Sequence, residues 1–217
     1  MALLKFQIAL ALMIFLPAWS LWFWEAWLYL GLFFLCAFVT TTYFLEHDPG
    51  LIERRLNVGP MAEPERSQKR ILTAASASMT ATYLVAGFDR HFGWSRPLPT
   101  ALILLADVLV VLGFVIMFVT FQANTHASSV VEVRDGQGVV STGPYGWVRH
   151  PMYVGGIVLF VATPIALGSL WALIPAAAVV ATVVFRLIDE ERYLTQRLPG
   201  YVDYQVRVRY RLIPGVW

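Results

Sequence analysis

Six long apolar stretches limit what this chain can fold into. Each contains 18 to 26 residues, and they fall at about 6–24, 26–45, 71–88, 98–123, 151–169 and 170–188. A helix of that length crosses about 30 Å of hydrocarbon, and the alternation typical of membrane strands is absent. Since 58% of the residues are hydrophobic and only 14% are charged, the sequence predicts an all-α, polytopic transmembrane helical bundle of about five to six segments.

The placement of lysine and arginine predicts the orientation of this bundle. If the N-terminus is cytoplasmic, only Arg90 and Arg96 among the 16 basic residues fall on the outer side. This asymmetry is the positive-inside signal, and it predicts an inner or plasma membrane protein with both termini in the cytoplasm. Four tryptophans are expected to anchor the first turn at the outer membrane surface: Trp19, Trp22, Trp24 and Trp27.

The chain divides into a generic first region, 1–123, and a second region, 124–217, that holds the polar motifs. The first region contains transmembrane helices without a distinctive motif. Asp107, near the middle of an apolar stretch, is expected to make a hydrogen bond that packs two helices together. The single cysteine, Cys36, has no partner, which excludes a disulfide.

The last two apolar stretches predict a helical hairpin. Pro164, Gly168 and Pro175 surround a tight reversal, so 151–188 is expected to leave and return to the cytoplasmic surface. The glycines at 155–156 would let a neighbouring helix approach closely. The two polar ends of the hairpin, VRHP and RLIDEE, are therefore expected to meet.

The first of these ends is suited to an anion. Pro151 favours the start of a helix with His150 as its cap. The free amide groups of the first turn and Arg149 attract negative charge. Tyr153 adds a hydroxyl group and Tyr145 an aromatic face. Taken singly, such residues are more often an interfacial belt of aromatic and basic side chains.

The second end supplies carboxylates. Arg186 and Glu190 are four residues apart and share a helix face, with Asp189 and Glu191 beside them. Alone, this pair would be an ordinary surface pair, and the basic run at 207–211 would be a patch for lipid headgroups. Together, the two ends offer an anion subsite, carboxylates and aromatic rings, which suit a zwitterion that carries a sulfonium and a ribose.

The strings VVSTGPYGWVRHPMYVGG and RLIDEERYLTQRLPGYVDYQVRVRYRLIP closely resemble the isoprenylcysteine carboxyl methyltransferase family and its phospholipid N-methyltransferase relatives. The resemblance covers about 130–217. It implies a membrane enzyme that uses S-adenosyl-L-methionine. It also implies that Arg186 handles the substrate carboxylate, and that the following residues contact the cofactor: Gln137, Gly138, Val139, Val140, Tyr145, His150, Pro151, Met152, Tyr153 and Glu190.

The predicted function is methyl transfer from S-adenosyl-L-methionine to a lipophilic or lipid-linked acceptor, with the carboxylate of an isoprenylcysteine-like molecule as the leading acceptor. The alternatives are a phospholipid N-methyltransferase, a small-thiol S-methyltransferase, and a small membrane transporter or assembly factor. Histidines are scattered rather than clustered, so no metal is expected. The net charge of +2 gives no reason to expect nucleic acid. Membrane lipids are the expected surroundings.

Overall fold

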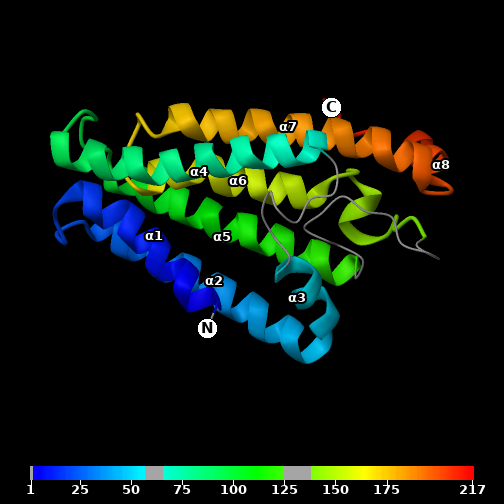
Figure 1. Cartoon of the computed structure of the whole chain (residues 1–217), viewed down its shortest axis with the longest axis horizontal. Coiled ribbons are helices and arrows are strands. Elements are labelled where there is room, and N and C mark those ends of the chain that lie inside the picture. The colour runs from blue at the N-terminus through cyan, green and yellow to red at the C-terminus, as the bar shows by residue number, and fades with distance from the viewer. Residues whose placement is uncertain (1, 57–65, 125–137) are drawn as a thin grey trace.

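The computed structural model describes residues 2–56, 66–124 and 138–217. All regular structure within these ranges is helical, which confirms the predicted all-α fold (Figure 1). The elements are α1 (Ala2–Ala18), α2 (Trp24–His47), α3 (Pro49–Leu56), α4 (Arg66–Phe92), α5 (Thr100–Ala123), the 3₁₀ helix η1 (Gly143–Gly146), α6 (Pro151–Ala166), α7 (Leu173–Arg197) and α8 (Tyr201–Arg207).

The long helices form the expected membrane bundle. Three of the described helices, α2, α4 and α5, are long and apolar enough to cross a membrane, and α1 and α6 are shorter apolar helices. Helix α7 is apolar in its first part and charged in its last turns. Figure 1 shows α4, α5, α6 and α7 running alongside one another, with the α1–α2 pair against them.

The C-terminal hairpin forms as predicted. Helix α6 ends at Ala166 and α7 begins at Leu173. Gly168 takes a left-handed conformation in the turn, with φ of +67°, which glycine adopts without a Cβ penalty. Pro164 lies within α6, and Pro175 lies in the first turn of α7, where a missing N–H costs nothing. The reversal therefore brings the charged end of α7 back toward the start of α6.

Helices α5 and α6 pack closely through glycine. A Cβ on Gly155 would lie 2.8 Å from the carbonyl oxygen of Gly113 on α5, and a Cβ on Gly113 would lie 2.8 Å from the carbonyl oxygen of Gly155. Backbones come this close only where both residues are small. This contact confirms the prediction for Gly155. At Gly156, the Phe160 ring is the only contact of a new Cβ among the described residues, at 3.9 Å, so no close approach of a neighbouring helix is seen there.

Replacing Gly155 with alanine is expected to destabilise the bundle. The added methyl group would clash with the backbone of α5 and push the helices apart, at a cost of about 1 to 3 kcal/mol. The matched control is Gly31→Ala in α2, where no atom of the described part of the chain lies within 4 Å of the new Cβ. Thermal unfolding in detergent micelles should show a lower midpoint for the first variant and an unchanged or higher midpoint for the second. Equal midpoints for Gly155→Ala and the wild type would contradict this packing.

Hydroxyl groups, and not the carboxylate of Asp107, make hydrogen bonds between helices in the described bundle core. The hydroxyl group of Tyr29 on α2 lies 2.9 Å from that of Tyr83 on α4 and 3.2 Å from Oγ1 of Thr163 on α6. Asp107 is buried, but neither of its carboxylate oxygens has a hydrogen-bond partner among the described residues. The predicted packing bond of Asp107 is therefore wrong, and hydroxyl groups join these helices instead.

Candidate active site

Three consecutive carboxylates at the end of α7 serve three different neighbours. Successive helical residues are about 100° apart, so Asp189, Glu190 and Glu191 point in different directions. Asp189 accepts hydrogen bonds at the start of α4 from Ser67 Oγ, at 2.8 Å, and from Gln68 Nε2, at 2.7 Å. Glu191 faces the loop before α6 and the C-terminal tail, whereas Glu190 faces a cavity between the helices.

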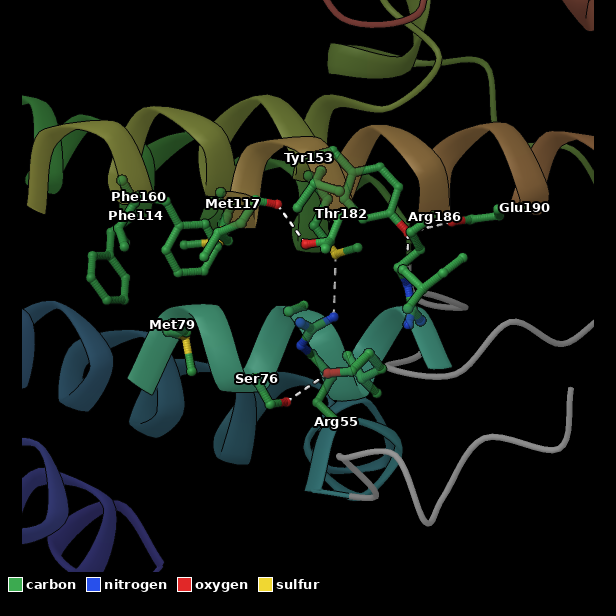
Figure 2. A pocket seen from close by; sticks show the side chains of 18 of the residues that line it. Arg55, Ser76, Met79, Phe114, Met117, Tyr153, Phe160, Thr182, Arg186 and Glu190 are labelled. Carbon is green, nitrogen blue, oxygen red and sulfur yellow. Dashed lines mark hydrogen bonds between the residues drawn. The ribbon is translucent and has the colours of Figure 1, made fainter. Parts of the chain in front are cut away.

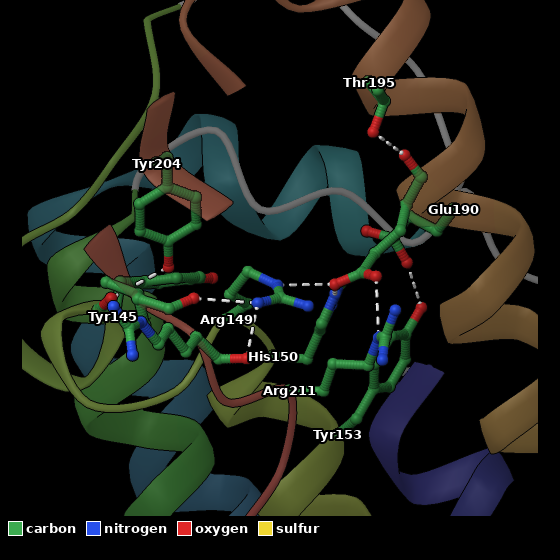
Figure 3. A network of polar contacts seen from close by, with 11 residues as sticks. Tyr145, Arg149, His150, Tyr153, Glu190, Thr195, Tyr204 and Arg211 are labelled. Carbon is green, nitrogen blue, oxygen red and sulfur yellow. Dashed lines mark hydrogen bonds and ion pairs between the residues drawn. The ribbon is translucent and has the colours of Figure 1, made fainter. Parts of the chain in front are cut away.

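Glu191 is the centre of a buried ionic cluster, whose other members Arg149, His150 and Arg211 are labelled in Figure 3. One carboxylate oxygen accepts from Arg149 Nε at 2.6 Å and lies 3.2 Å from His150 Nε2, and the other accepts from Arg211 Nε at 2.8 Å. Burial alone would raise the pKa of Glu191, but the hydrogen bonds from His150, Arg149 and Arg211 outweigh it and lower the pKa to about 2. The carboxylate is therefore ionised at any physiological pH.

The same cluster fixes the backbone on both sides of it. Arg149 Nη1 donates to the carbonyl oxygens of Val208 and Arg209, each at 2.8 Å. The backbone amides of Arg149 and His150 donate to the carbonyl oxygens of Tyr210 and Arg211. Arg149 was predicted to attract an external anion, but its partner is a carboxylate of the same chain. Arg211, at the end of the basic run 207–211, likewise belongs to this cluster.

A second group of polar side chains faces the cavity. The Tyr153 hydroxyl group, two residues after the start of α6, donates to Glu190 Oε2 on α7. Arg186 Nε donates to the same hydroxyl oxygen at 3.1 Å. Arg186 and Glu190 share one face of α7, as predicted, and the Tyr153 side chain reaches both of them from α6. The two polar ends of the hairpin thus meet through this trio as well as through the Glu191 cluster.

The cavity has a polar end and a long apolar part. Its volume is about 420 Å³, and Arg55, Tyr153, Arg186 and Glu190 form the polar end. Figure 2 shows α4 on one side and α6 and α7 on the other, with side chains pointing into the space between them. The apolar walls consist mainly of aromatic and methionine side chains: Phe6, Phe33, Met79, Phe114, Met117 and Phe160.

Arg55 of α3 is a component of the site that the motifs did not reveal. Its guanidinium carbon lies 4.3 Å from the centroid of the Phe121 ring, and Nη1 donates to Sδ of Met152 at 3.4 Å. Burial lowers the pKa of Arg55 to about 10, partly offset by the nearby Tyr153 and Tyr145. The guanidinium therefore stays charged, and the cavity has two cations at its polar end. The sequence signalled Arg55 only as one of many basic residues on one side of the membrane.

The loop before η1 lies against α8 rather than against the cavity. Val139 packs on a buried cluster that includes Leu198, Tyr201 and Tyr204. Tyr204 donates to the carbonyl oxygen of Tyr145 at 2.8 Å, which holds η1 in place. The Tyr145 hydroxyl group accepts from Asn124 Nδ2 at 3.1 Å, at the end of α5.

The predicted site residues fall into groups in the structure. Met152, Tyr153, Arg186 and Glu190 line one cavity. Tyr145 lies near the polar end of this cavity, close enough to interact electrostatically with Glu190 and Arg55. The remaining predicted residues do not line the cavity: His150 and Pro151 are buried at the start of α6, Gly138, Val139 and Val140 belong to the loop, and Gln137 lies outside the described residues. Their roles toward a cofactor stay predictions.

Comparison with known proteins bears on the resemblance seen in the sequence. No curated protein matches the sequence. The model of the phospholipid methyltransferase family matches residues 101–199, from α5 through the end of α7. The match confirms the predicted resemblance to phospholipid methyltransferases for this part of the chain.

Proposed function

We propose that the protein transfers a methyl group from S-adenosyl-L-methionine to a lipophilic acceptor with an anionic group, and that an isoprenylcysteine-like carboxylate is the acceptor that fits best. The observation that carries this proposal is the Tyr153–Glu190–Arg186 trio at the polar end of a long apolar cavity. The polar end suits the reacting groups, and the apolar part suits the tail of the acceptor.

The donor and acceptor groups of the site fit S-adenosyl-L-methionine. This molecule carries a sulfonium, an ammonium, a carboxylate and ribose hydroxyls. Glu190 offers an acceptor for a hydroxyl or ammonium group, and Tyr153 and Tyr145 offer aromatic faces near a cation. We infer that these three residues hold the cofactor, while contacts from loop residues 137–140 and from His150 and Pro151 stay predictions of the resemblance.

The acceptor end of the site is cationic. Arg55 and Arg186 line the same cavity, and both influence the charge around Tyr153. A guanidinium group binds a carboxylate through paired hydrogen bonds. We infer that Arg186 orients the acceptor carboxylate and that Arg55 adds a second positive charge. The apolar walls then hold the hydrocarbon tail and exclude water from the reacting atoms.

The chemistry requires alignment more than proton transfer. S-adenosyl-L-methionine supplies a methyl group that is already activated by its sulfonium. The acceptor oxygen forms a bond to the methyl carbon while the carbon–sulfur bond breaks and its electron pair stays on sulfur. A carboxylate releases no proton in this step, so no general base is needed. The contribution of Arg186 and the cavity walls is to hold the oxygen in line with that bond.

Phospholipid N-methylation is the second candidate. The family match favours it directly, and two arginines suit a phosphate as well as a carboxylate. An amine acceptor must lose a proton, and the carboxylate of Glu190, which lines the cavity, would accept that proton. A panel of labelled-methyl assays with prenylcysteine analogues, phosphatidylethanolamine and small thiols separates these candidates by the product that gains the label. No labelled product with any of them would contradict both.

Replacing Glu190 with glutamine is expected to weaken cofactor binding by about 10- to 100-fold, because a charge-assisted hydrogen bond is lost while the side-chain size is kept. Isothermal titration of the purified protein with S-adenosyl-L-methionine measures this change. Glu46→Gln, an exposed position on α2, is the matched control and should bind like the wild type. Unchanged affinity in Glu190→Gln would remove this residue from the cofactor site.

A further inference from the structure

A second cavity lies at the opposite end of the bundle. Its volume is about 280 Å³, and it is formed by the start of α2, the end of α4, the α4–α5 connection and the α6–α7 turn. Helix α4 runs from Gln68, beside the candidate active site, to Asp89, beside this cavity. At 1.5 Å per residue the two places are about 30 Å apart. The second cavity is therefore a separate site.

Asp89 and two serines build one wall of this cavity. The carboxylate of Asp89 accepts from the backbone amide of Ser95 at 2.6 Å, and from the hydroxyl groups of Ser95 and Ser169, each at 2.5 Å. Leu170 N in turn donates to Ser95 Oγ at 2.9 Å. These bonds join the α4–α5 connection to the α6–α7 turn. The hydrogen-bonding capacity of Asp89 is used within the protein, so Asp89 fixes the shape of the cavity.

Glu25, in the first turn of α2, is different. Its side chain lines the cavity and only 9% of the residue is exposed, yet Oε2 accepts no hydrogen bond from any described residue. The N-terminal end of a helix favours the ionised form of a carboxylate. A buried carboxylate needs a donor that compensates for its lost hydration, and the described part of the chain does not supply one to this oxygen.

Two arginines line the same cavity without pairing with Glu25. Arg90 Nη2 donates instead to the carbonyl oxygen of Trp22 at 2.8 Å, and its guanidinium carbon lies 5.3 Å from the centroid of the Phe23 ring. Arg90 and Arg96 are both exposed at the mouth of the cavity. The cavity thus offers a buried carboxylate and an exposed cationic rim, which together match a ligand with an ammonium group and a phosphate group.

Exposed tryptophans near this cavity indicate that it lies at the level of lipid headgroups. Tryptophan gathers where the hydrocarbon of a membrane meets water. Six of the eight tryptophans of the chain lie in the segments around this end of the bundle, and all of them are exposed: Trp19, Trp22, Trp24, Trp27, Trp94 and Trp171. A ligand at this position is therefore expected to be a membrane lipid.

We propose that this cavity binds the headgroup of a phosphatidylethanolamine-type lipid, with its primary ammonium on Glu25 and its phosphate on Arg90 and Arg96. A primary ammonium carries three N–H donors for a buried carboxylate oxygen. The quaternary ammonium of phosphatidylcholine has none, and phosphatidylglycerol has no cation. The site therefore distinguishes headgroups by hydrogen bonding as well as by charge.

Native mass spectrometry and thermal unfolding of the purified full chain in detergent micelles test this proposal. Phosphatidylethanolamine is expected to be retained, and to raise the unfolding midpoint, at about tenfold lower concentration than phosphatidylcholine with the same acyl chains. Glu25→Gln should lose this preference, and Arg96→Gln should weaken the retention of both lipids. Glu46→Gln, which removes an exposed carboxylate from the same helix, should keep it.

Each contrary result would overturn the proposal. The first is equal retention of the two lipids by the wild type, and the second is an unchanged preference in Glu25→Gln. The third is an equal rise of the unfolding midpoint with water-soluble phosphoethanolamine, which would make the ligand a free molecule and not a lipid. The comparison of the two lipids uses the wild type alone, so it tests the proposal even where a variant does not fold. Arg186→Gln should keep the preference, and loss of it in that variant would assign the lipid to the other cavity.

Discussion

Replacing Glu191 with alanine is expected to release the C-terminal tail from the bundle and to cost about 3 to 5 kcal/mol locally. Glu191 is 5% exposed, and removal of its carboxylate leaves the buried Arg149 and the half-buried Arg211 without their counter-charge and the buried His150 without its hydrogen-bond partner. Since those three residues lie on the loop before α6 and on the tail, both segments should loosen. Limited proteolysis and hydrogen exchange of residues 208–217 measure this directly, while circular dichroism reports whether the membrane helices remain.

Asp203→Asn is the local control, because Asp203 is exposed in the first turn of α8 and its loss should cost less than about 1 kcal/mol. A protected tail in Glu191→Ala would show that packing, rather than this ionic cluster, holds the tail in place.

Acid should have the same effect on the wild type. The pKa of Glu191 is lowered from 4.5 to about 2 in the folded protein. Its contribution to stability is therefore complete above about pH 4.5, and is lost as the pH falls toward 2. The difference of about 2.5 pKa values corresponds to about 3 kcal/mol. In the wild type, the protection of the tail against hydrogen exchange should fall as the pH is lowered from about 4.5 to about 2. In Glu191→Gln, the protection should not change with pH over this range. A flat profile in the wild type would contradict the role given to Glu191.

The sequence predicted the part of the fold that depends on local rules. Apolar length identified the membrane helices, and Pro164, Gly168 and Pro175 identified the hairpin turn. The hairpin in turn predicted that the starts and ends of α6 and α7 meet, and Tyr153 and Glu190 do so. Each of these inferences needs only chain direction and segment length.

Partner choice within the site could not be predicted in the same way. The three adjacent carboxylates of α7 point in three directions, and their partners lie on α4, α6 and the C-terminal tail. No local sequence pattern reveals how these segments pack around α7. Glu191 therefore looked like a companion of Glu190 rather than the centre of its own cluster. Arg55 comes from an eight-residue helix almost a hundred residues before Met152, which it contacts.

The largest effect on activity is expected from Arg186→Gln, which should lower kcat/KM for a prenylcysteine-like carboxylate by about 10²- to 10³-fold. The variant keeps hydrogen-bonding capacity but removes a half-buried charge, and loss of one partner from such a charged contact costs about 3 to 4 kcal/mol. If Arg186 positions the acceptor, the loss appears in the acceptor kinetics, and the Kd for S-adenosyl-L-methionine changes by less than about threefold. Labelled-methyl kinetics with varied acceptor, together with cofactor titration, separate the two quantities.

Thr182→Val is the matched control for this variant. Thr182 lies one turn before Arg186 on α7 and lines the same cavity, but its hydroxyl group donates to the carbonyl oxygen of Val179 in its own helix, at 2.7 Å. Its replacement keeps the size of the side chain and should leave kcat/KM within about threefold. Equal losses of cofactor and acceptor binding in Arg186→Gln would instead make Arg186 a positioning residue for Tyr153 and Glu190. A small loss with the carboxylate would contradict the role given to Arg186 in holding that acceptor, and would leave phospholipid N-methylation as the better candidate.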